Sequence, residues 1–163
     1  MLLEFSSSIM CLILAGKVGS NIASELGTMR VTQQIDALDI MGVNSAGYLI
    51  MPKILGLMTL MPCLVIFADV MGVIGAYATA YIGHILSPED LTLGLQHAFN
   101  PWFVWMSIIK STVFAFIIAS VSSFCGYTVE GGSVEVGKAS TSAVVNSSIL
   151  ILFSDVFLTQ LLS

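Results

Sequence analysis

The chain has 163 residues, of which 56% are hydrophobic and 9% are charged, and its formal net charge is −5. Soluble domains carry about 25% charged residues, so this composition indicates a membrane protein of one domain. The five basic residues are spread along the sequence. A nucleic-acid-binding surface needs clustered lysine and arginine, so this function class is excluded.

Apolar stretches follow one another along the chain. About twenty apolar residues are needed to cross the hydrocarbon core of a bilayer as a helix. Tyr48–Gly83, Trp102–Val129 and Ala143–Leu162 are long enough, whereas the first run, Met1–Ala15, is too short and resembles the second half of a helix. Backbone groups in lipid must be satisfied within each segment, and no stretch alternates like a barrel strand. We therefore predict an all-α fold, a polytopic membrane helical bundle with three full transmembrane helices and a partial one.

The stretch Tyr48–Gly83 is longer than a membrane requires, so it must tilt, kink or project into water. Pro62 is the predicted kink site. Gly72, Ala76 and Ala80 follow at a spacing of four, and small residues at this spacing let two helices approach closely. We expect this stripe to pack within the bundle, with a dimer face as the alternative.

The basic residues predict which connections face the cytoplasm. Gly16–Gly47 and Glu130–Ser142 contain lysine or arginine, whereas His84–Pro101 contains neither. The positive-inside rule therefore places the first and last connections in the cytoplasm and the middle one outside. Three alternating spans then leave the carboxyl end, Ser163, on the outer side.

The long inner connection contains a helical pattern between Gly27 and Gly42. Val31, Ile35, Leu38 and Met41 fall at helical spacing on one face, and charged or amide side chains occupy much of the rest. A helix that lies on lipid is one interpretation, but such helices are usually rich in lysine on the polar face. We therefore favour a cytoplasmic amphipathic helix that docks into a groove on a protein partner.

Ionisable residues also occur inside the predicted spans, namely Asp69, Lys110 and Asp155. Such groups are costly in hydrocarbon and usually pair with one another or line a watery path. Structural pairing and a substrate or proton path are both open interpretations. Lys110 and Asp155 would sit at a similar depth, which allows an ion pair, although Lys110 could instead snorkel to the headgroups.

The chain offers no residue set for enzymatic catalysis. Its three cysteines lack partners at metal-ligand spacing and are expected to be buried thiols. Gly16–Lys17 resembles the end of a phosphate-binding loop, but Val18 stands where serine or threonine is required. We expect no cofactor or metal, and if ATP energises this protein, a separate subunit binds it.

A series of motifs extends over nearly the whole chain. The series comprises AGKVGS at 15–20, ASELGTMRVT at 23–32, QIDAL at 34–38, MGVN at 41–44, PK at 52–53, KS at 110–111, GY at 126–127, GG at 131–132, VGKA at 136–139, VV at 144–145, SS at 147–148 and DVFLT at 155–159. Together these motifs resemble the signature of the MlaE/YrbE permeases, the membrane subunits of ABC systems that work with MCE-domain proteins.

The resemblance implies a homodimeric permease in the bacterial inner membrane. Such a permease binds a separate ABC ATPase subunit, sits beneath an MCE-domain periplasmic protein, and moves phospholipid between the inner membrane and the periplasmic path to the outer membrane. Residues 1–163 would form a single MlaE-type permease domain whose amino-terminal helices lie outside this sequence.

The resemblance also implies that Glu25–Gly42 contains the coupling helix that engages the ATPase. Its candidate residues are Glu25, Gly27, Thr28, Arg30, Thr32, Gln34, Ile35, Asp36, Leu38 and Gly42.

A lipid permease must hold acyl chains in an apolar cavity and keep the headgroup near water. Met58, Met61 and Phe67 are candidates for lining it, since methionine is flexible and polarisable. Two other functions stay open. One is a proton-coupled or other non-ABC transporter subunit that uses Asp69 or Asp155, and the other is a non-transporting membrane scaffold.

Overall fold

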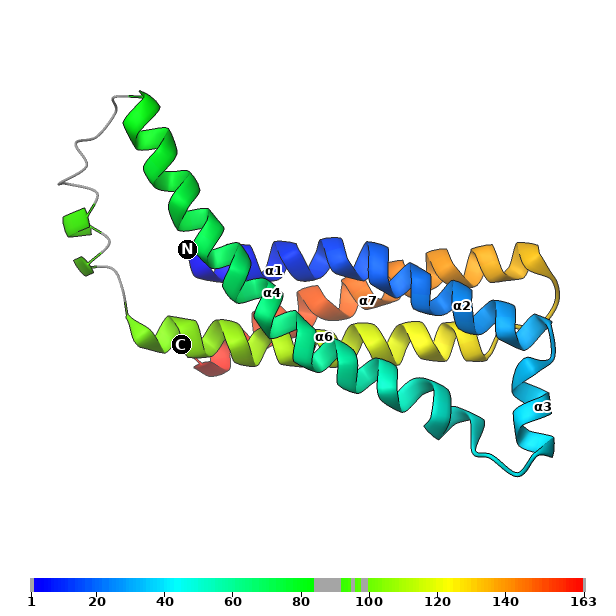
Figure 1. Cartoon of the computed structure of the whole chain (residues 1–163). Coiled ribbons are helices and arrows are strands. Elements are labelled where there is room, and N and C mark those ends of the chain that lie inside the picture. The colour runs from blue at the N-terminus through cyan, green and yellow to red at the C-terminus, as the bar shows by residue number, and fades with distance from the viewer. Residues whose placement is uncertain (1, 84–91, 95, 98–99, 163) are drawn as a thin grey trace.

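The computed structural model describes residues 2–83, 92–94, 96–97 and 100–162 (Figure 1). Over these residues the chain is helical and contains no strand, which confirms the predicted all-α class. The main elements are α1 (Leu2–Leu14), the π-helical segment η1 (Ala15–Gly19), α2 (Ser20–Val31), α3 (Gln34–Ile40), α4 (Ser45–Gly83), α6 (Pro101–Tyr127) and α7 (Ser133–Leu162).

The helices run up and down one long axis (Figure 1). α1, η1 and α2 form one continuous rod, α4 returns along it, α6 runs forward and α7 returns again (Figure 1). α3 lies across the end of the bundle where α6 ends and α7 begins (Figure 1). The connections on either side of α3 and the α6–α7 turn therefore share one end, as the alternation of basic residues predicts.

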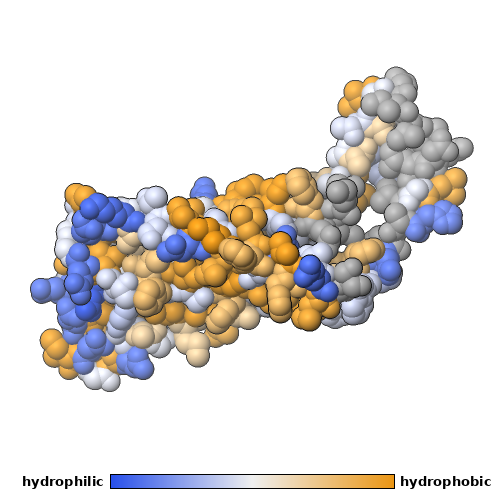
Figure 2. Space-filling model, turned by 180° about the vertical axis from the view of Figure 1, so that it is seen from behind, coloured by the Kyte–Doolittle hydropathy of each residue, from blue (hydrophilic) through white to orange (hydrophobic). Residues whose placement is uncertain are grey.

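The described residues include four helices that are long and apolar enough to cross a membrane. They are Phe5–Val31, Ser45–Gly83, Pro101–Tyr127 and Ser133–Leu161. Hydrophobic side chains cover the middle of the molecule, and hydrophilic ones gather at the end that carries α3 (Figure 2). This distribution is what a bilayer-spanning bundle requires, because charged groups are costly in hydrocarbon.

The prediction that the first apolar run is too short to span is wrong. The helix does not stop at Ala15 but continues through η1 into α2 and ends at Val31. Polar residues in this part lower its hydropathy, yet α2 packs against both α6 and α7. Packing of this kind, rather than residue propensity, supplies most of the stability of a helix in a protein.

The prediction of a loop over Glu130–Ser142 is also wrong, since α7 begins at Ser133. Its polar first turns are held by contacts that hydropathy does not register. Lys138 pairs with Glu135 at 2.8 Å, and the Ser140 hydroxyl donates to the carbonyl of Ser20 on α2. The predicted outer segment His84–Pro101 lies mostly outside the described residues.

The core lies in the middle of the bundle and draws on every long rod. Its buried side chains are Cys11, Ala15, Met61, Phe114, Ala115, Ile118 and Ile151. Cys11 is a buried thiol as predicted, whereas Cys63 is exposed on α4. In lipid, tight van der Waals packing of this kind is a main source of helix association.

Two features of α4 bear on the sequence predictions. Pro52 and Pro62 both lie inside a helix that continues to Gly83. Among the described residues, no atom outside the local helix lies within 4 Å of the position that a Cβ would occupy on Gly72 or Gly75. The expectation that this small-residue stripe packs within the bundle is therefore wrong for its glycines, because α4 diverges from the other rods toward its end (Figure 1).

Gly126 brings α6 into close contact with α2. A Cβ at this position would lie 2.7 Å from the carbonyl oxygen of Ala23 and 3.0 Å from its Cα. Both atoms belong to the backbone, which cannot swing aside as a flexible side chain can. The approach of the two helices therefore depends on the missing Cβ.

We expect Gly126→Ala to destabilise the fold by about 1–3 kcal/mol, since the added methyl forces α2 away from α6. Thermal unfolding of the purified protein in detergent would measure this loss. Gly72→Ala is the matched control, because nothing lies within 4 Å of the position of its Cβ. Equal melting temperatures for Gly126→Ala and the unsubstituted protein would contradict the close approach.

Candidate functional site

The first candidate site is the elbow, defined as residues Arg30–Ser45, at the polar end of the bundle. α2 ends where Thr32 donates both its backbone N–H and its hydroxyl to the carbonyl of Thr28, at 3.0 Å and 2.8 Å. Gln33 then adopts a left-handed backbone with φ of 60°, and α3 starts at Gln34. The chain therefore turns sharply between the two helices.

The far side of the elbow is set by a glycine and a cap. Gly42 has φ of 78°, a conformation that favours glycine, and it ends α3 as predicted. The side chain of Asn44 accepts the N–H of Gly47 at 3.2 Å and so caps the start of α4.

The prediction of one amphipathic helix from Gly27 to Gly42 is wrong, because the left-handed residue Gln33 divides it. Gln33 is the non-glycine residue with positive φ in the described part of the chain. Within the predicted face, Ile35 at the start of α3 is buried, whereas Met41, at the C-cap of α3, is 68% exposed. The spacing of apolar residues cannot reveal this break between the two helices, because a local turn at Thr32–Gln33 still satisfies the backbone hydrogen bonds.

α3 presents a mixed surface to its surroundings. Ile40 is 87% exposed, and Asp36 and Asp39 are exposed beside it. Large apolar side chains standing free at a polar end of a bundle are typical of a docking surface. Together with Met41, Ile40 forms what we call the apolar tip.

The elbow is tied to the bundle by polar contacts. Arg30 donates to Asp36 at 2.8 Å and its guanidinium lies 5.8 Å from the centre of the Tyr127 ring. The hydroxyls of Tyr127 and Ser45 are 2.9 Å apart. Glu25, just before the elbow, forms an ion pair with Lys53 on α4.

The remaining predicted residues divide between packing and local bonding. Gly27 faces inward, where a Cβ would lie 3.1 Å from Val136. Thr28 donates its hydroxyl to the carbonyl of Ser24 at 2.7 Å, Leu38 is half-buried, and Gln34 is exposed. Sequence reasoning did not single out Tyr127 and Ser45 as partners of this region, since neither lies within the helical pattern.

The second candidate site is an intramembrane cluster around Lys110. Its side chain is 1% exposed, and its Nζ lies 3.3 Å from Oδ1 of Asp155. The same ammonium donates to the hydroxyl of Thr159 at 2.7 Å, and Ser8 donates to Oδ2 of Asp155 at 2.9 Å. The cluster links α1, α6 and α7, and snorkelling of Lys110 to the headgroups is excluded by its burial.

Asp69 lies apart from this ion pair. It is half-buried on α4, and the hydroxyl of Ser107 on α6 donates to it across 3.5 Å. The polar partners of the cluster were missed by sequence reasoning. The spacing of one partner carries a signal, because Thr159 follows Asp155 by one helical turn.

The three predicted lipid-cavity residues differ in their burial on α4. Met61 belongs to the closed core, Met58 packs against that core, and Phe67 is 60% exposed. Met58 and Met61 lie one helical turn apart and face the core, whereas Phe67 lies on another face of α4, and sequence cannot assign these faces without the neighbouring helices.

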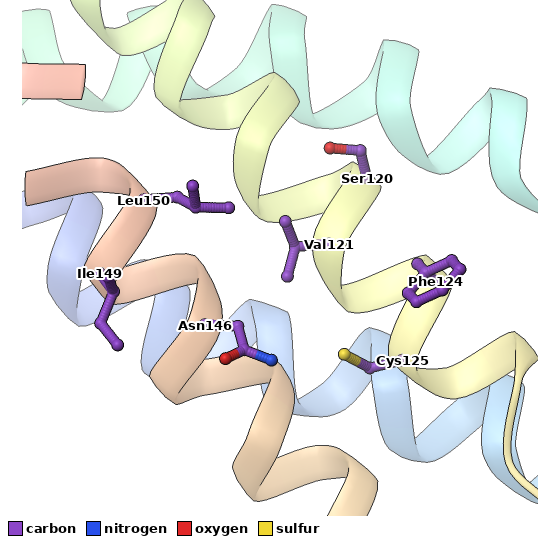
Figure 3. Close-up of a pocket in the computed structure, with 7 residues that line it drawn as sticks. All are labelled: Ser120, Val121, Phe124, Cys125, Asn146, Ile149 and Leu150. Atoms are coloured by element: carbon purple, nitrogen blue, oxygen red, sulfur yellow. The ribbon is translucent and has the colours of Figure 1, made fainter. Parts of the chain in front are cut away.

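An open groove lies instead between α6 and α7. Its volume is about 560 Å³. Val121 and Cys125 on α6 and Asn146 and Leu150 on α7 face the space between the helices (Figure 3). A second hollow of about 620 Å³ shares Asn146 and continues to Lys138 on the polar side. The groove is apolar along most of its length and becomes polar toward the end that carries α3.

Comparison with known proteins supports one family over nearly the full chain. The Permease MlaE family matches residues 1–161. The chain belongs to the MlaE permease family. A probable ABC transporter permease protein of Rickettsia bellii is 46% identical over 92% of this chain and 58% of its own length.

Relatives of lower identity also align over most of this chain. A probable ABC transporter permease protein of Synechocystis is 33% identical over 98% of this chain and 60% of its own length. The chloroplastic protein TRIGALACTOSYLDIACYLGLYCEROL 1 of Arabidopsis thaliana is 33% identical over 96% of this chain and 45% of its own length. The chain thus spans about three-fifths of the two bacterial relatives and less than half of the Arabidopsis protein. Its helices and its family together indicate a multi-pass membrane protein.

Proposed function

We propose that this chain is part of the permease subunit of an ABC-type system that moves phospholipid between the bacterial inner membrane and the periplasmic path to the outer membrane. A separate ATPase subunit supplies the energy, and an MCE-domain protein receives or delivers the lipid on the outer side. The permease acts as a homodimer.

The observation that carries this proposal is the elbow. α3 lies at the polar end of the bundle (Figure 1), and it carries the apolar tip, Ile40 and Met41, whose exposed side chains a soluble partner can reach. The charges beside it are Asp36, which pairs with Arg30, and Asp39, and the elbow has no lysine, which favours a protein partner over a lipid surface. The names of the bacterial relatives, which contain the words ABC transporter permease, support an ATPase as that partner.

Several features support a lipid as the substrate. The groove between α6 and α7 is open at the surface of the chain and is lined mostly by apolar side chains, which suits acyl chains. The Arabidopsis relative carries the name of a glycolipid. Exposed apolar side chains on α4 and α7 also leave room for a second copy of the chain or for lipid.

The intramembrane cluster supports a structural role better than a proton relay. Asp155 has both a cationic partner and a hydroxyl donor, so its charge is compensated where it stands. A relay needs a carboxylate that can lose its partner during each cycle. In the proposed permease the cluster holds α1, α6 and α7 in register while the elbow is pushed by the ATPase.

The proposal predicts ATP-driven lipid transfer. The protein would be tagged at its carboxyl end, purified from its native membranes with its bound ATPase, and placed in vesicles containing a fluorescent phosphatidylethanolamine. We expect transfer that stops when ATP is withheld and persists when a proton ionophore is added. Transfer abolished by the ionophore would support the proton-coupled alternative, and ATPase binding without transfer would support a scaffold.

A further inference from the structure

α3 is attached to the bundle through few neighbours. Among the described elements, its backbone lies close to α2 and α4 but not to α6 or α7. A movement of α3 is therefore transmitted to the bundle by the two segments that flank it. These flanks are the turn at Thr32–Gln33 and the stretch that leads to Ser45. What those flanks touch decides which helices respond.

One side chain of α6 contacts both flanks. Tyr127, the last residue of α6, has its ring 5.8 Å from the guanidinium of Arg30, which precedes α3. Its hydroxyl lies 2.9 Å from that of Ser45, which follows α3 and begins α4. Arg30 is also fixed by Asp36 on α3 itself, at 2.8 Å.

Other contacts of the region do not reach α6. The Glu25–Lys53 pair joins α2 directly to α4 and is partly exposed, and the Arg30–Asp36 pair stays within the elbow. Among the described residues, the polar contacts seen between the elbow and α6 are those of Tyr127 with Arg30 and with Ser45. The hydroxyl bond is part-buried, so water competes with it less than with the exposed pairs.

We propose that Tyr127 is the positioning residue that ties both flanks of α3 to α6, so that a push on α3 moves α6 together with α2 and α4. This inference rests on the proposed function of α3 as the element that the ATPase engages. Without the tie, α3 still binds its partner, but its motion reaches α6 and the groove beside it only through the packing of α2 and α4 against α6, and part of it is absorbed at the two flanks.

The tie can be tested without the ATPase. Spin labels at Ala37→Cys on α3 and Glu130→Cys after α6, with the native cysteines replaced by serine or alanine, report the distance between the elbow and α6 in lipid nanodiscs. We expect Tyr127→Phe and Ser45→Ala each to broaden the distance distribution at least about twofold, because each removes the same hydroxyl bond. The double variant should broaden it no further, and Ser45→Thr, which keeps a hydroxyl, should match the unsubstituted protein.

Unchanged widths in both single variants would overturn the inference. In the complex with ATPase, Tyr127→Phe should leave capture of the ATPase intact and lower the lipid moved per ATP hydrolysed about fivefold, the equivalent of one ordinary hydrogen bond. An unchanged ratio also overturns it. If the unsubstituted protein captures no ATPase, the proposed function fails, and the label distances still decide whether Tyr127 holds α3.

Discussion

Ile40→Glu combined with Met41→Glu should lower the affinity for the ATPase subunit about 100-fold or more. Burying each of these side chains in a partner groove is worth about 1.5–3 kcal/mol, and a carboxylate placed there would have to be desolvated without a partner. Both side chains are largely exposed in the chain alone, so the substitutions leave the bundle intact. Capture of the ATPase on the tagged permease, titrated with the purified subunit, measures the change.

The choice of the apolar tip follows from the structure. Arg30 and Leu38 lie in the same predicted helix, but Arg30 is held by Asp36 and Leu38 is half-buried, so changing them would disturb the elbow itself. Val134→Glu is the matched control, because Val134 is an exposed apolar residue at the same end but on α7. Equal losses in the control and the tip variant would mean that α3 is not the docking element.

Asp155→Ala should destabilise the bundle by about 3–5 kcal/mol, because it leaves the buried ammonium of Lys110 without its counter-charge. The substitution also removes the acceptor of the Ser8 hydroxyl and so loosens α1 from α7. Unfolding in mixed micelles with increasing SDS would measure the loss.

The double variant Lys110→Met with Asp155→Leu separates charge compensation from a role in transport. Replacing a buried pair by apolar residues of similar volume is often neutral, so we expect stability to return close to that of the unsubstituted protein. Asp155→Asn should leave ATPase capture unchanged, because the cluster lies away from the elbow. A double variant as unstable as Asp155→Ala would show that the ion pair is not what holds these helices.

The sequence by itself determined the membrane class, the helical fold and the approximate place of the long spans. These depend on hydropathy summed over many residues, and the bilayer demands them of any chain. The sequence also placed Gly42 at a helix end, because a glycine after an amphipathic run allows the left-handed turn there. The sequence also indicated that Lys110 and Asp155 lie at a similar depth in the membrane, because each lies a similar number of residues from the outer end of its span.

The tertiary structure alone decided the features on which function depends. It extended the first helix to Val31 and broke the amphipathic pattern at Gln33, since packing and local hydrogen bonds outweigh periodicity there. It separated Met61 in the core from Phe67 on the surface, because the face of a helix acquires a meaning only when its neighbours are in place. For the same reason the contact of Tyr127 with both flanks of α3, which joins residues far apart in the chain, could be read only from the folded molecule.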